Sequence, residues 1–134
     1  MRRVILLLAV LLFFFSAPQV AAASPTVKIR LDGGTNFGSH AVGTTTARTV
    51  TITNTGSSTV YVGTIGVSSN DGAFLYDNSG TNTCHSGVGP YLEPGESCSY
   101  VILFSPQTTG TLTGTTDVGI DNESTILKLR GRGV

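Results

Sequence analysis

The sequence of 134 residues is poor in the groups that most enzymes use. It has no tryptophan, one methionine, two cysteines and two histidines, and charged residues make up 12% of it. No G-x-S-x-G, C-x-x-C, H-E-x-x-H, Walker or EF-hand pattern occurs. Because catalysis needs converging titratable groups, this scarcity argues against an enzyme. We therefore expect no catalytic residue, no cofactor and no metal ligand.

The chain also lacks an apolar run long enough to cross a membrane as a helix. Its longest run, Val4 to Phe15, has twelve residues, whereas a spanning helix needs about 20. Arg2 and Arg3 precede this run, and Ala21 and Ala23 offer an A-x-A cleavage site after it. This layout predicts a Sec-type signal peptide at residues 1–23, so that a secreted or periplasmic protein begins at Ser24.

The expected mature chain, residues 24–134, has the length of one domain. Removal of the signal peptide leaves six basic and eight acidic residues, a net charge of −2 with the histidines neutral. This balance excludes the basic surface of a nucleic-acid binder and a polybasic membrane-surface segment. We expect a single domain with no membrane segment after cleavage.

Apolar residues in the mature part recur with period two, which indicates strands. Cys98, Tyr100, Ile102 and Phe104 share one face in this way, before Ser105-Pro106 ends the pairing. We expect residues 46–53 and 59–67 to form neighbouring antiparallel strands, joined by the Asn54–Gly56 turn. About seven strands are expected, at residues 26–31, 46–53, 59–67, 73–76, 97–104, 110–120 and 124–134. The pattern predicts an all-β fold, an immunoglobulin-like antiparallel β-sandwich of about seven strands with one disulfide.

The mature part contains two cysteines, Cys84 and Cys98. In an exported chain the simplest expectation is that they form a disulfide. The alternative is a reactive thiol that uses His85 or His40 as its base. Neighbouring side chains of an extended segment point to opposite faces, so His85 is badly placed to activate Cys84.

An oxygen-rich loop follows the short apolar segment at residues 73–76. Its carboxylates and amides, with those just before it, are of a type that calcium binds, but their spacing matches no calcium loop. Asx residues are common in turns, which is the interpretation we favour. The residues concerned are Asn70, Asp71, Asp77, Asn78 and Asn82.

Three segments of the sequence together resemble a known family. They are residues 37–67, which include "NTG" after a threonine-rich strand, residues 84–120, with "LEPGESC" before "FSP", and residues 127–134, "LKLRGRGV". In this order they resemble the ASH or hydin-like domain, which is named choice-of-anchor D in exported bacterial proteins and is related to major sperm protein domains. The resemblance implies a seven-stranded immunoglobulin-like sandwich with paired cysteines and a role in holding or bridging proteins.

These observations favour an exported, non-catalytic structural or protein-binding module whose partner is another envelope or extracellular protein. An exposed sheet edge is one way to bind such a partner. The alternatives are a free carbohydrate- or ligand-binding sandwich and a hydrolase that uses Cys84 or Cys98. The absence of tryptophan and the dispersed tyrosines argue against the carbohydrate-binding alternative.

Overall fold

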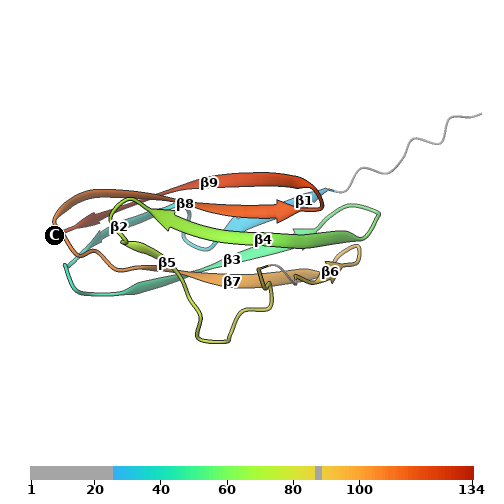
Figure 1. The fold of residues 1–134 in the computed structure, drawn as a ribbon, viewed down its shortest axis with the longest axis horizontal. Coiled ribbons are helices and arrows are strands. Elements are labelled where there is room, and N and C mark those ends of the chain that lie inside the picture. The colour runs from blue at the N-terminus through green and yellow to red at the C-terminus, as the bar shows by residue number, and fades with distance from the viewer. Residues whose placement is uncertain (1–25, 87–88) are drawn as a thin grey trace, which may run out of the picture.

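The computed structural model describes residues 26–86 and 89–134, in which nine strands form two sheets and no helix occurs (Figure 1). The strands are β1 (Val27–Leu31), β2 (Asn36–His40), β3 (Thr46–Asn54), β4 (Val60–Ser69), β5 (Phe74–Tyr76), β6 (Tyr91–Leu92), β7 (Ser97–Phe104), β8 (Gly110–Ile120) and β9 (Glu123–Gly133). The expected all-β sandwich is confirmed. The two strands that the sequence pattern did not predict are β2 and β6.

The four-stranded sheet has the order β1-β3-β7-β5, and all its pairs are antiparallel. Because side chains alternate along β3, Val50 and Ile52 point into the core, as predicted. On β7 the same is true of the residues at even positions, which are Cys98, Tyr100, Ile102 and Phe104. Threonines occupy the outer positions of β3. This sheet therefore has one apolar and one hydroxyl-rich face, as a half-buried antiparallel sheet requires.

The five-stranded sheet has the order β2-β9-β8-β4-β6. Its centre is the hairpin of β8 and β9, two 11-residue strands paired along their whole length. β2 pairs with β9 in parallel, the one departure from the expected antiparallel pairing within the described residues. Phe37 anchors β2 because its ring is buried against those of Phe74 and Phe104.

The expectation that residues 46–53 and 59–67 would be neighbouring strands was wrong. β3 lies in the four-stranded sheet between β1 and β7, whereas β4 lies in the other sheet between β8 and β6. The side chain of Asn54, fully buried at the end of β3, donates hydrogen bonds to the carbonyls of Ser58 and Leu92. These bonds hold the connection as a crossover between sheets, and so the segment forms no hairpin turn.

The single core lies between the two sheets, and both sheets contribute to it. Phe37, Phe74 and Phe104 fill one end, where ring centroids are 4.8 to 5.7 Å apart. Gly131 on β9 faces this cluster, because a Cβ there would lie 2.3 Å from Cζ of Phe104. The glycine therefore lets β9 approach the aromatic rings closely.

The expected signal peptide, residues 1–23, lies outside the described residues, and so do Val88 and Gly87. Among the residues that the structure describes, no helix is long and apolar enough to cross a membrane.

Candidate functional site

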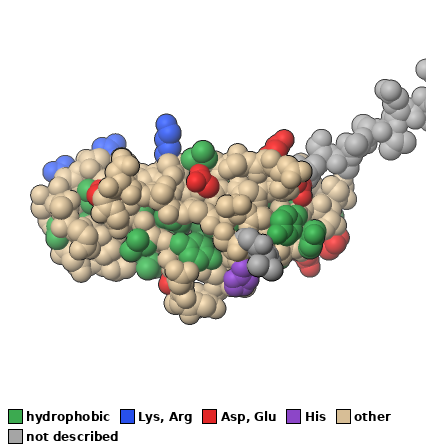
Figure 2. All heavy atoms as spheres, viewed as in Figure 1, with side chains coloured by type: hydrophobic (Ala, Val, Ile, Leu, Met, Phe, Trp, Pro, Cys, Tyr) green, Lys and Arg blue, Asp and Glu red, His purple; other side chains and the backbone are tan. Residues whose placement is uncertain are grey.

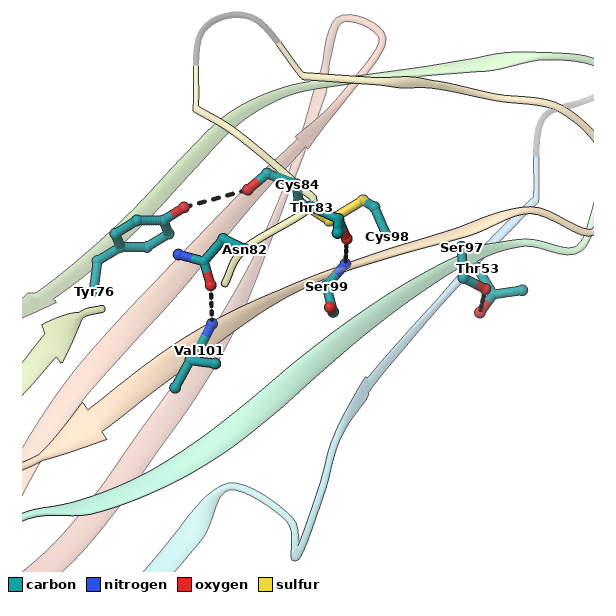
Figure 3. The surroundings of a disulfide bond; sticks show 9 residues. All are labelled: Thr53, Tyr76, Asn82, Thr83, Cys84, Ser97, Cys98, Ser99 and Val101. Carbon is teal, nitrogen blue, oxygen red and sulfur yellow. Dashed lines mark hydrogen bonds between the residues drawn. A yellow bond between two sulfur atoms is a disulfide. The ribbon is translucent and has the colours of Figure 1, made fainter. Parts of the chain in front are cut away.

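The disulfide joins the loop after β5 to the first half of β7 (Figure 3). The Cα atoms of Cys84 and Cys98 are 5.1 Å apart, and both residues are buried. The chain has no other cysteine, so neither sulfur is available as the nucleophile of a thiol hydrolase. The geometry makes this pair a structural link between a loop and a core strand.

Hydrogen bonds hold the same loop along the free side of β7 beyond the point where β5 ends. The Oδ1 atom of Asn82 accepts a bond from the backbone nitrogen of Val101, at 2.9 Å, and Thr83 accepts one from Ser99, at 2.8 Å (Figure 3). Tyr76 donates to the carbonyl of Cys84. The loop therefore covers part of the edge of β7 and shields it from a partner strand.

The two histidines considered as possible bases for a thiol lie in different environments. His40 is part-buried, where its ring nitrogens contact the carbonyl of Phe37 at 2.8 Å and the hydroxyl of Thr46 at 3.0 Å. His85 is exposed next to the buried Cys84. With both sulfurs in the disulfide, neither ring has a thiol to activate.

Two of the residues considered as calcium ligands, Asp71 and Asp77, form turns with their side chains. Asp71 accepts a bond from the nitrogen of Ala73, and Asp77 accepts bonds from the nitrogen and hydroxyl of Ser79. Asn82 donates to the carbonyl of Asp77. Within residues 26–86 and 89–134, no three His, Cys, Asp or Glu side chains converge as a metal site would require.

Tyrosines that are dispersed along the sequence form a pair in the structure. Tyr61 on β4 and Tyr91 on β6 are paired across the two strands, and their ring centroids are 5.0 Å apart. Tyr91 is 70% exposed. Their separation of 30 positions and the shortness of β6 left no pattern from which this pairing could be predicted.

Solved structures with the same architecture come from proteins of different activities. The ASH/PapD-like domain 7 of human CEP192 is 20% identical over 88% of this chain and 92% of that domain, with a TM-score of 0.54. The secreted serine protease VesC of Vibrio cholerae is 16% identical with a TM-score of 0.56, over 86% of this chain. A family 123 glycoside hydrolase of Clostridium perfringens is 13% identical with a TM-score of 0.57, over 81% of this chain.

The match covers most of the CEP192 domain but only 24% and 27% of the two enzymes, so the chain corresponds to about a quarter of each enzyme's length. At these identities the similarity shows a shared fold. A search of curated proteins gave no match.

The sequence of the domain itself identifies its family. A family model described as the HYDIN/CFA65/VesB-like, Ig-like domain matches residues 27–132, from the first residue of β1 nearly to the end of β9. The ASH-like features of the sequence and the similarity to the CEP192 domain agree with this match. The chain belongs to the HYDIN/CFA65/VesB-like family of Ig-like domains.

Proposed function

We propose that this protein is an exported, non-catalytic module that binds another protein of the cell envelope or the extracellular space. The observation that carries the proposal is the disulfide-braced Ig-like sandwich, because the cysteines, His40 and Asn82, all considered for chemistry, have structural roles in it. Ig-like domains of this architecture serve many functions, and binding through sheet edges and faces suits a rigid sandwich.

Export is supported by two independent features. Residues 1–23 have the composition and cleavage pattern of a Sec-type signal peptide. The Cys84–Cys98 disulfide persists in oxidising compartments and is rare in a reducing cytosol. Both features point to a domain, residues 24–134, that works outside the cytoplasm.

The free edges of the sheets offer one mode of binding. β1, five residues long, is an edge strand of the four-stranded sheet, whereas β5 and β6 have only three and two residues. At the remaining edge, β2 is interrupted by Gly38 at a φ of 79° and by a shift in register. Of the four edge strands, β1 is therefore the longest regular one to which an extended partner segment can add a strand.

Fractionation and crosslinking test this proposal. The full chain is expressed in an exporting host, and mass spectrometry of the exported form determines its first residue and the state of its cysteines. We expect a chain that begins at Ser24, with no free thiol, and that crosslinks to a discrete envelope or extracellular protein. Retention of residues 1–23 in the cytoplasm would contradict export, and the absence of any crosslinked protein would contradict the binding role.

The Tyr61–Tyr91 pair supports a second candidate, glycan binding. Exposed aromatic rings stack on sugar faces, and Tyr91 is the more exposed of the two. This function predicts that the unmodified protein binds glycans on an array and that Tyr91→Ala abolishes this binding. Tyr76→Phe, a substitution outside the pair, should leave the binding unchanged. Equal retention of both variants would exclude the pair as a glycan site.

A further inference from the structure

The outer face of the five-stranded sheet divides its charges between its two ends. Toward the C-terminal end of β9, Lys128, Arg130 and Arg132 lie on alternate, exposed positions and point outward. Their partners across β8 are three threonines at 115, 113 and 111. In Figure 2, Lys and Arg side chains project from the β9 margin toward the left of the molecule. This end of the face is a cationic ridge.

The other end of the same face is acidic. Asp117 on β8 lies opposite Ile126. Asp121 lies at the β8–β9 turn, where its Oδ1 atom accepts a hydrogen bond from the backbone nitrogen of Tyr61. Between Asp117 and the turn the face is hollowed, with a volume of about 590 Å³, because Gly63 and Gly119 have no side chains to fill it. We call this region the acidic hollow. The Oδ1 atom of Asp117 is buried and has no hydrogen-bond partner among the described residues.

The two ends do not neutralise each other within one copy. Within the described part of the chain the one ion pair joins Arg30 and Asp32, on the other sheet. Lys128 lies diagonally across from Asp117, but it lines a separate depression with Arg130, whereas Asp117 lines the acidic hollow. The face therefore presents three exposed cations toward one end and two carboxylates, those of Asp117 and Asp121, toward the other.

A second copy of this chain is the partner that matches both ends at once. If two such faces meet about a two-fold axis that crosses the strands between the Lys128 and Ile126 positions, the strand direction reverses. The cationic ridge of each copy then lies over the acidic hollow of the other. A polyanion or a polycation running along the face would meet like charges at one end, which costs affinity.

We propose that the protein forms a homodimer through the outer faces of β4, β8 and β9, with the cationic ridge of one copy seated in the acidic hollow of the other. Such a contact is isologous, as closed two-fold dimers require. It gives Asp117 of each copy a cationic neighbour and covers Ile126, which is 61% exposed. The inference goes beyond the proposed function, since it holds whether or not the module also binds another protein.

The size of the face sets the expected affinity. β8 has 11 residues, which at about 3.4 Å per residue gives a length of about 37 Å, and three strands span about 14 Å. Each copy then buries on the order of 500 Å², so the total is about 1,000 Å², at the lower limit of specific interfaces. We therefore expect a reversible dimer, with a dissociation constant in the micromolar range and a marked dependence on salt.

Sedimentation equilibrium of the protein purified from an exporting host tests the dimer. We expect a concentration-dependent dimer at 50 mM salt whose dissociation constant rises at least tenfold at 500 mM. Lys128→Glu, at an exposed position, and Asp117→Lys are each expected to weaken it at least tenfold, and Asp117→Asn severalfold. Lys28→Glu, an equal charge change on the outer side of β1, is the matched control and should leave the constant unchanged.

Mixing the two charge-reversed proteins gives the sharper result. In the mixed dimer each reversed charge faces its opposite, so an equimolar mixture of Lys128→Glu and Asp117→Lys should dimerise although neither does alone. This recovery also shows that both variants are folded. The proposal is overturned if the unmodified protein stays monomeric to about 200 µM at low salt, or if its dimer resists both substitutions. A monomer that binds a lysine-rich peptide would assign the acidic hollow to a different, basic partner.

Discussion

At the scale of single residues, the most telling contact is between two hydroxyls in the core. Tyr100 on β7 is fully buried, and its hydroxyl lies 2.7 Å from Oγ1 of Thr116 on β8. Thr116 donates in turn to the carbonyl of Gly66 on β4, so Tyr100 is the donor to Thr116. This chain of hydrogen bonds crosses from one sheet to the other. Burial raises the pKa of Tyr100 to about 12.

Tyr100→Phe tests this arrangement through its dependence on pH. Near pH 7 we expect the variant to be less stable by about 1 kcal/mol, because one buried hydrogen bond is lost. The raised pKa favours the neutral phenol in the folded state, so its contribution is complete below pH 10 and is lost as the pH rises toward 12. By linkage the unmodified protein loses about 1.4 kcal/mol at pH 11.

Urea unfolding of both proteins at pH 8 and pH 11 measures this difference. Because the other tyrosines are common to the two proteins, their ionisation cancels in the comparison. We expect the deficit of the variant to disappear at pH 11. A deficit that is the same at both values would show that Tyr100 ionises as it does in water.

At the scale of the strands, the connection between β3 and β4 determines how the two sheets meet. Asn54 closes this connection with its amide, which reaches Ser58 and Leu92, and with its Oδ1 atom, which accepts a bond from the nitrogen of Gly56. Its backbone nitrogen also donates to Glu96. One buried side chain therefore ties the end of β3, the crossover and β6 together.

We expect Asn54→Ala to lower the free energy of unfolding by about 2 to 4 kcal/mol. Three hydrogen bonds are lost, and the carbonyl of Leu92 keeps no side-chain donor in a buried environment. The control is Thr53→Ala, whose exposed hydroxyl bonds only to Ser97 and should matter by less than about 0.5 kcal/mol. Thermal and urea unfolding compare the two variants, and equal losses would argue against the tie.

The strands were predictable where apolar and polar residues alternate over a stretch long enough to define one buried face. Val50 and Ile52, and the even positions of β7, were assigned to the core correctly. β2 was missed because Phe37 is its only large apolar residue, and β6 because two residues show no period. The hairpin between β3 and β4 was predicted wrongly, since "NTG" is compatible with a turn and the burial of Asn54 depends on Leu92, far along the chain.

The candidate surfaces were less accessible to prediction than the core. The Tyr61–Tyr91 pair and the division of charge on the outer sheet face arise from pairing across strands. The sequence contains these residues but not their register, and a shift of one residue would place each side chain on the opposite face. Registers of distant strands are set by the packed core as a whole.

At the scale of the whole molecule, β7 links two differently stabilised ends of the sandwich. Phe104, at one end of this strand, packs into the aromatic cluster, and Cys98, near its other end, carries the disulfide. The aromatic end is held by ring packing and by backbone hydrogen bonds, such as those that Val42 donates to Val134 and Gly43 donates to Pro106. The other end contains the loop of Cys84, which the disulfide and a few hydrogen bonds join to the strand.

Removal of the disulfide should therefore weaken the fold without abolishing it. The Cys84→Ala, Cys98→Ala double variant is expected to lose about 3 kcal/mol of stability, the contribution of closing a loop of about 15 residues. Its unfolding should remain a single cooperative transition, because the aromatic end and the Tyr100 contact still join the two sheets. Urea unfolding monitored by tyrosine fluorescence and by circular dichroism measures both quantities.

A reductant should lower the stability of the unmodified protein to that of the double variant and leave the double variant unchanged. Two separated transitions in the variant would show instead that the disulfide holds the loop end and the aromatic end together as one unit. For a domain with a total stability of about 5 to 15 kcal/mol, a loss of this size leaves a folded but marginal protein, which is why the domain benefits from an oxidising compartment.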